Sequence, residues 1–128
     1  MATKGILLVG GRGTRLLPLT ETTPKPMLKV AGVPFTLHQL LKAKAAGSSE
    51  IVLATSFMAE VFEPYFGDGS KWGMEIHYAV EKEPLGTGGA IRNAAQMLGR
   101  DEDIAIFNGD VLSRHDIAAQ IAFHQKKR

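Results

Sequence analysis

The sequence predicts an α/β fold in which a mostly parallel sheet carries helices on both faces. Short apolar stretches alternate along the chain with stretches of helical period, which is the order that a parallel sheet with crossover helices requires. The first apolar run, residues 6–9, is continuous and bounded by glycine, as expected for a strand buried on both faces. The 128 residues, with 45% hydrophobic and 22% charged side chains, are enough for one domain, residues 1–128, with a substantial core.

The other elements follow in chain order. Lys25 stands between two prolines, which predicts an extended and stiff segment. Residues 27–32 predict a short strand that turns at Gly32, and a helix is expected from Pro34 until Gly47. The later elements are a strand at 50–56, a short helix at 57–66 broken near Pro64, turns at 67–73, a strand at 74–80, a helix at 86–99, a strand at 103–110 and a helix at 115–127.

The composition excludes several classes of function. A net charge of +2 is too small to indicate nucleic acid, although the cations at positions 12, 15, 25 and 29 gather in one short stretch. The chain has no cysteine, which rules out disulfides and thiolate metal sites. The first apolar run is too short for a signal peptide and no stretch is long enough to span a membrane. We therefore expect a cytoplasmic protein with no nucleic acid and no membrane as partners.

A glycine-rich loop follows the first strand directly. Glycines at 10, 11 and 13 allow backbone N–H groups to approach phosphate oxygens without a Cβ in the way. Arg12 and Arg15 add charge-assisted hydrogen bonds, and Thr14 adds a hydroxyl. The alternative is a tight turn with exposed arginines, but three glycines beside two arginines favour a phosphate-binding loop.

Two familiar phosphate loops do not fit this stretch. A P-loop needs a lysine directly after its last glycine, and no lysine stands at that spacing. A dinucleotide fingerprint needs a third glycine where this chain has Leu16.

Three polar segments follow predicted strands: residues 10–15, 81–89 and 108–110. The carboxyl ends of parallel strands meet at one edge of a sheet, and ligands bind outside that edge. The sequence therefore predicts that the three segments form one site.

The stretch LLVGGRGTRLLPLTETTPKPML, residues 7–28, closely resembles the signature of the sugar-phosphate nucleotidyltransferases, also called nucleotide-sugar pyrophosphorylases. Their pattern runs roughly G-G-x-G-T-R-L-x-P-L-T, a short spacer and P-K-P, and every element is present. The resemblance continues through residues 56–91 and through FNGDVLS at 107–113. Within the family, the chain most resembles the mannose-1-phosphate guanylyltransferase branch, which makes GDP-mannose.

The resemblance implies a Rossmann-like, glycosyltransferase-A-like fold, of which this chain holds the nucleotide-binding N-terminal part. It implies a reaction in which a sugar 1-phosphate attacks the α-phosphorus of a nucleoside triphosphate, GTP in this branch, and pyrophosphate leaves. It also implies that Mg²⁺ takes part. The family continues past this length, and its second metal-binding aspartate is expected beyond residue 128.

The family pattern assigns roles to individual residues. Gly10, Gly11, Gly13, Thr14 and Arg15 are expected to hold the triphosphate. Arg15 and Lys25 are the expected catalytic cations, with Lys25 near the α-phosphate and the attacking phosphate. Asp110 is expected to bind Mg²⁺, which prefers oxygen ligands. The alternatives are an exposed lysine in a proline loop and an aspartate that caps the next helix.

The segment after the third long strand resembles the part of the family that reads the base. Glu81 stands where relatives that read thymine or uracil often carry glutamine, and a carboxylate can accept both N1–H and the exocyclic amine of guanine. Gly86, Thr87 and Gly88 are expected to contact the base or line its pocket. The alternatives are a solvated strand end at Glu81 and a helix start whose glycines allow close packing.

The four histidines, at 38, 77, 115 and 124, lack metal-binding spacing, and we expect surface or packing roles for them. Three hypotheses remain for the whole chain. It is the N-terminal part of an enzyme that makes GDP-mannose, a nucleotide-binding module without catalysis, or an assembly unit that forms a homo-oligomer through an exposed sheet edge.

Overall fold

A computed structural model describes residues 3–10, 17–19, 21–56, 58–83, 85–99, 103–109 and 111–127. Its strands are β1 (Lys4–Leu8), β2 (Lys29–Val30), β3 (Val33–Pro34), β4 (Glu50–Thr55), β5 (Glu75–Val80) and β6 (Ile104–Asn108). Its α-helices are α1 (Phe35–Ala45), α2 (Phe62–Phe66), α3 (Gly86–Ala95) and α4 (Ile117–Lys127). Short 3₁₀ turns lie at η2 (Lys25–Met27), η3 (Ala59–Val61) and η4 (Ser70–Trp72).

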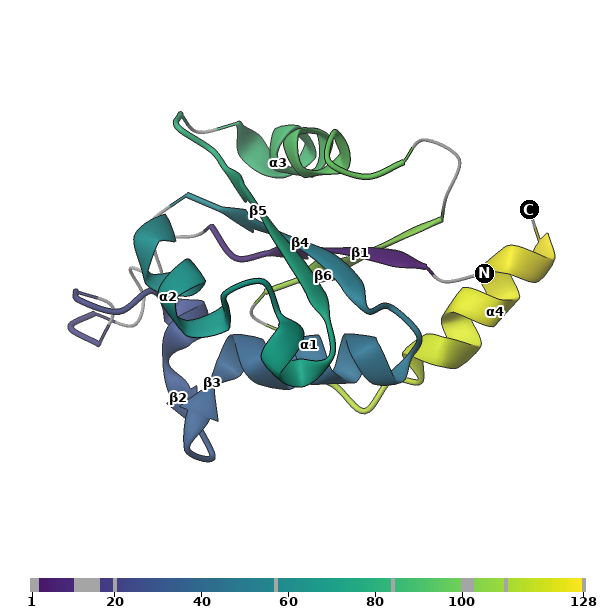
Figure 1. Ribbon diagram of the computed structural model, residues 1–128, viewed down its shortest axis with the longest axis horizontal. Coiled ribbons are helices and arrows are strands. Elements are labelled where there is room, and N and C mark those ends of the chain that lie inside the picture. Colours follow the sequence, from purple (N-terminus) through teal and green to yellow (C-terminus); the bar gives the residue numbers. More distant parts are fainter. Residues whose placement is uncertain are drawn as a thin grey trace.

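The main sheet has the strand order β5-β4-β1-β6, and every neighbouring pair in it is parallel. Figure 1 shows α3 on one side of this sheet and α1 on the other, while α4 lies apart near the N-terminus. The predicted fold class, a parallel sheet with helices on both faces, is confirmed. Because the chain moves from β1 to β4 and later returns to the other side of β1, the strand order reverses at β1, where ligands bind in such sheets.

Two apolar layers hold the sheet, one on each face. Leu7 of β1 and Leu53 of β4 pack in the layer that contains Leu40 of α1. Their sequence neighbours Ile6 and Val52 point the other way and pack in the layer that contains Ala94 of α3 and Leu98. This alternation follows from the period of two along a strand, and a run that is apolar at every position fills both layers.

The segment around Lys25 differs from its prediction. The sequence predicted extended backbone, but Lys25–Met27 forms a 3₁₀ turn in which the Met27 N–H donates to the Pro24 carbonyl at 2.8 Å. Pro26 tolerates the turn because the first residues of a helical turn need no intrahelical N–H bond. Tertiary packing favours the turn, since Pro26 and Met27 are buried and Thr36 Oγ1 donates to the Pro26 carbonyl at 2.8 Å.

Two smaller predictions are also corrected. Pro64 does not break the short helix, because it lies in the first turn of α2, where a missing N–H costs no intrahelical bond. The helical segment begins after Met58, whose φ is +53°. The strand expected at 27–32 is a two-residue strand, β2, that pairs antiparallel with β3 across a turn at Gly32, where φ is +86°. The hairpin forms because glycine tolerates that left-handed conformation.

Candidate functional site

A cleft of about 590 Å³ opens at the carboxyl ends of the main strands. The end of each strand contributes to its wall: Gly10 follows β1, Ser56 follows β4, Glu81 follows β5 and Asn108 ends β6. Gly86 and Thr87 at the start of α3 complete the polar lining. The structure thus brings parts of the three polar segments together at one edge of the sheet.

The glycine loop leaves the sheet from a fixed point. The Val9 N–H donates to the Ala54 carbonyl at 3.1 Å, and Ser56 Oγ donates to the Gly10 carbonyl at 2.5 Å. A Cβ at position 10 would lie 2.7 Å from Ser56 Oγ, so a larger residue there would displace the hydroxyl group that donates to the Gly10 carbonyl. The start of the loop is therefore held against the neighbouring strand.

The wall formed by Glu81 and α3 offers both an acceptor and donors. Glu81 is half-buried, and its backbone N–H donates a hydrogen bond to the Thr55 carbonyl at 2.8 Å. This bond fixes the position of the Glu81 backbone beside β4. The helix α3 starts at Gly86 with φ +70°, and its N-cap residue, Leu85, makes no side-chain cap hydrogen bond. The first N–H groups of a helix have no intrahelical acceptor, so Gly86 and Thr87 present backbone donors where they line the cleft.

The end of β6 is held close to β1. A Cβ at Gly109 would overlap the carbonyl oxygen of Leu8, so the chain passes β1 at a distance that only glycine permits. Gln39 Nε2 of α1 donates to the carbonyl oxygens of Asn108 at 2.8 Å and Val111 at 2.6 Å. These contacts fix the backbone on both sides of position 110.

Not every predicted site residue reaches this cleft or is described. Lys25 lies on η2 between the buried residues Pro24 and Pro26, and it is not among the cleft-lining residues, nor is the exposed Gly88. The residues Gly11, Arg12, Gly13, Thr14, Arg15 and Asp110 lie outside the described residues. The roles assigned to all of these residues stay predictions.

No role for Ser56 was predicted from the sequence, and Asn108 was predicted only as part of a polar strand end. Both line the cleft. Ser56 is the last residue of the strand predicted at 50–56 and directly follows β4, so the strand-end rule that selected the other segments also applies to it. The hydrogen bond from Ser56 to Gly10 could not be predicted from the local sequence pattern, because the two residues are 46 positions apart.

One of the four histidines, His77, lies beside two carboxylates. Glu50 and Glu75, the first residues of β4 and β5, pair directly across the sheet. His77 Nε2 lies 3.5 Å from Glu50 Oε1 and 3.4 Å from Glu75 Oε1, and Lys4 Nζ lies 3.5 Å from the other Glu50 oxygen. The three acidic and imidazole groups are close enough to share a metal ion, but they lie at the amino ends of the strands, opposite the cleft.

Comparison with known proteins defines the class. The chain belongs to the nucleotidyl transferase family, whose model matches residues 4–128. It is 51% identical over 123 residues to mannose-1-phosphate guanylyltransferase of Mycobacterium tuberculosis, covering 96% of this chain and 34% of that protein. It is 40% identical over 124 residues to mannose-1-phosphate guanyltransferase of Gibberella zeae, covering 95% of this chain and 34% of that protein. The chain therefore spans about a third of the length of these relatives.

Solved structures share the fold. A putative glucose-1-phosphate thymidylyltransferase from Bacillus anthracis superposes with a TM-score of 0.89 at 29% identity, covering 99% of this chain and 52% of that one. HddC from Yersinia pseudotuberculosis, solved with GMP-PN, gives a TM-score of 0.81 at 30% identity, covering 94% and 53%. The family resemblance seen in the sequence is confirmed. None of the helices in the described part of the chain has the length and apolar character needed to cross a bilayer.

Proposed function

We propose that this chain is the nucleotide-binding part of a nucleotidyltransferase that makes GDP-mannose and pyrophosphate from GTP and mannose 1-phosphate. The observation that carries the proposal is the cleft itself, which is lined by Gly10, by Glu81 and by the start of α3. The relatives named as mannose-1-phosphate guanylyltransferases support the choice of sugar and base. The structural likeness to a protein solved with GMP-PN supports a guanine nucleotide.

The reaction needs alignment and charge neutralisation rather than a protein nucleophile, because both substrates bring phosphate groups. In this proposal the loop of Gly11, Gly13 and Thr14 binds the triphosphate through backbone N–H groups and a hydroxyl. Arg15 binds two phosphate oxygens with its planar guanidinium group. Lys25 supplies a compact charge near the α-phosphate, and the buried prolines on either side of it limit where its backbone lies.

The residues around position 110 fit a bound Mg²⁺. Asp110 offers the hard oxygen ligand that this ion prefers, and the backbone beside it is held to β1 by the close approach of Gly109 to Leu8. When bound, Mg²⁺ supplies charge neutralisation to the phosphates. In this proposal the chain supports the ligand role of Asp110 through the backbone on either side of it, which is held at Gly109 and at Val111.

Glu81 is proposed to select guanine. Its carboxylate can accept two hydrogen bonds from the N1–H and amine of guanine, a pair that thymine and uracil lack. Glu81→Gln is expected to lower the preference for GTP over dTTP at least about tenfold, because a charge-assisted pair is replaced by a neutral one. Isothermal titration with GTP, ATP and dTTP, with and without Mg²⁺, measures this preference. An unchanged preference would remove Glu81 from base recognition.

The catalytic half of the proposal needs a turnover assay. The chain is mixed with GTP, mannose 1-phosphate and Mg²⁺, alone and together with the part of the Mycobacterium tuberculosis relative that it does not match. Pyrophosphate release in the mixture supports the proposal, and Arg15→Ala and Lys25→Ala are expected to lower it at least about a hundredfold, as expected when a charged transition-state contact is removed. Absence of release in every mixture, despite GTP binding, would reject the proposed activity.

A nucleotide-binding module without catalysis is the second candidate, and the cleft at the strand ends would serve it equally well. It predicts GTP binding that Arg15→Ala abolishes, with no pyrophosphate release. The third candidate, a homo-oligomer, is favoured by β6, which pairs only with β1 within the described residues and leaves Ile106 48% exposed. It predicts that sedimentation experiments will show a stable oligomer, and that added nucleotide will not change its size.

A further inference from the structure

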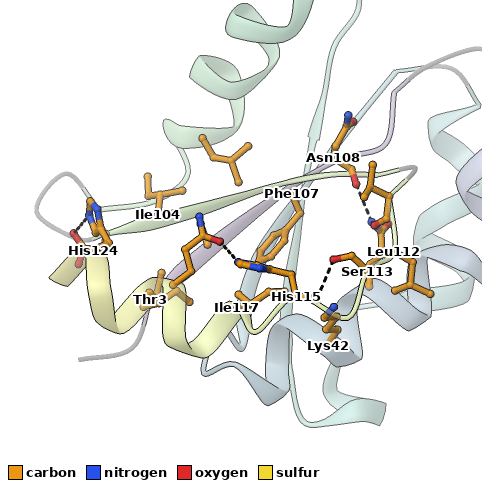
Figure 2. A pocket seen from close by; sticks show the side chains of 17 residues that line it. Thr3, Lys42, Ile104, Phe107, Asn108, Leu112, Ser113, His115, Ile117 and His124 are labelled. Atoms are coloured by element: carbon orange, nitrogen blue, oxygen red, sulfur yellow. Dashed lines mark hydrogen bonds and ion pairs between the residues drawn. The ribbon is translucent and has the colours of Figure 1, made fainter. Parts of the chain in front are cut away.

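A second cavity lies away from the nucleotide cleft, between β6, α1 and α4. Its volume is about 410 Å³, and its walls are largely apolar, with Ile104, Phe107, Leu112 and Ile117 among them. Figure 2 shows Asn108 at one end of this cavity and His124 at the other, with Lys42 beside Ser113. Ile106 and Asn108 of β6 line both this cavity and the nucleotide cleft. The strand β6 therefore separates the cavity from the proposed nucleotide site.

Two residues of α1 that line this cavity each have a buried polar atom without a partner among the described residues. Gln39 is only 7% exposed, and its Nε2 donates to two backbone carbonyls, but its Oε1 has no hydrogen-bond partner in the described part of the chain. Lys42 Nζ is shielded from solvent and also has no partner within the described residues. Burying such groups without a partner is costly, and an unpaired ammonium group is the more costly of the two.

The other titratable side chains described at the cavity make contacts elsewhere. Asp103 lies 3.4 Å from His124, and His115 Nε2 is 2.6 Å from Gln120 Oε1. Within the described residues, Lys42 thus remains a cation without a partner beside apolar walls. A single negative charge on an apolar body satisfies both conditions, whereas a phosphate dianion would leave a second charge to bury.

We propose that this cavity binds a small amphipathic carboxylate. The carboxylate accepts a charge-assisted hydrogen bond from Lys42 Nζ, and the hydrocarbon body fills the space lined by Ile104, Phe107 and Ile117. A water or hydroxyl beside the carboxylate donates to Gln39 Oε1. The site is independent of the proposed nucleotide-binding function, since none of its ligand contacts involves the glycine loop, Glu81 or α3.

The test uses the whole 128-residue chain and octanoate as the probe, with 1-octanol as a probe of the same chain length without the charge. Isothermal titration is expected to show saturable binding of octanoate, and 1-octanol is expected to bind at least about tenfold more weakly. Lys42→Met keeps the length and apolar stem of the side chain and is expected to lower octanoate affinity at least about tenfold. Lys126→Met, on the exposed side of α4, is the matched control and should leave it unchanged.

Circular dichroism and thermal unfolding first check that each variant is folded. If Lys42→Met does not fold, the comparison of octanoate with 1-octanol on the unaltered chain decides. Equal affinity of the two probes, equal affinity of the unaltered chain and Lys42→Met for octanoate, or no saturable binding of octanoate would each overturn the proposal.

Discussion

The main sheet is packed very differently at the two ends of its strand order, β5-β4-β1 and β6. On one side, β4 buries five of its six residues, and α1 buries residues along its whole length. On the other side, β6 buries none of its residues, and neither does α4. Phe123 of α4 is 63% exposed. We call these the closed side, β5-β4-β1 with α1 and α3, and the open side, β6 with α4.

This difference affects how the two parts of the cleft are supported. The closed side contributes Gly10, whose carbonyl accepts a hydrogen bond from Ser56 Oγ, and Glu81, whose N–H donates to the Thr55 carbonyl. The open side contributes Asn108, whose carbonyl accepts a hydrogen bond from Gln39 Nε2. No residue of β6 itself is buried. Apolar burial is the main source of stability, so the free energy of unfolding should come mostly from the closed side.

The largest expected effect tests that statement directly. Leu40→Ala removes a side chain with no exposed surface from the core under α1, and it is expected to lower the free energy of unfolding by about 2–5 kcal/mol. Phe123→Ala on the open side is expected to lower it by less than about 1 kcal/mol. Urea unfolding measures both. Similar losses for the two variants would show that α4 packs as firmly as α1.

The next effect compares two glycines at the cleft edge. Gly109→Ala places a Cβ against the Leu8 backbone, and the strain is expected to lower the free energy of unfolding by about 1–3 kcal/mol. Gly88→Ala meets nothing within 4 Å in α3 and is expected to raise it by up to about 1 kcal/mol. Thermal unfolding measures both shifts, and GTP titration should show weaker binding for Gly109→Ala. Shifts of the same sign would contradict the close approach of β6 to β1.

A smaller effect is expected at the junction of β1 and β4. Ser56→Ala removes the hydrogen bond to the Gly10 carbonyl and is expected to cost about 1 kcal/mol, with weaker GTP binding because the start of the glycine loop is released. Ser49→Ala, an exposed serine before β4, is the control and should stay within about 0.5 kcal/mol. If both variants bind GTP as the unaltered chain does, Ser56 has no positioning role.

The smallest effect concerns a tyrosine on the closed side. Burial raises the pKa of Tyr78 to about 12, and the carboxylates of Glu63 and Asp68 contribute. Because the folded state holds this proton more tightly than the unfolded chain, the associated stability is complete below about pH 10 and is lost as the pH rises toward the folded value. Urea unfolding at about pH 9 and about pH 11 should show a smaller loss for Tyr78→Phe than for the unaltered chain. An equal loss would mean that other groups account for the alkaline effect.

The sequence predicted the elements whose signal is local. The apolar runs at 6–9 and 50–56 became β1 and β4, and the glycine-led stretch at 86–99 became α3. Because parallel strands end at a common edge, the order of these elements was enough to predict one cleft that receives Gly10, Glu81 and Gly86.

Features that depend on residues distant in sequence were determined by tertiary packing. Packing of Pro26 under Thr36 turned the stretch around Lys25 into a 3₁₀ turn against the local preference of its prolines. The register of β4 and β5 brought His77 to Glu50 and Glu75, and helix α1 carried Gln39 and Lys42 to the cavity beside β6. Periodicity along a chain reports which face of an element is apolar, whereas only the packed structure determines which buried polar groups have found a partner.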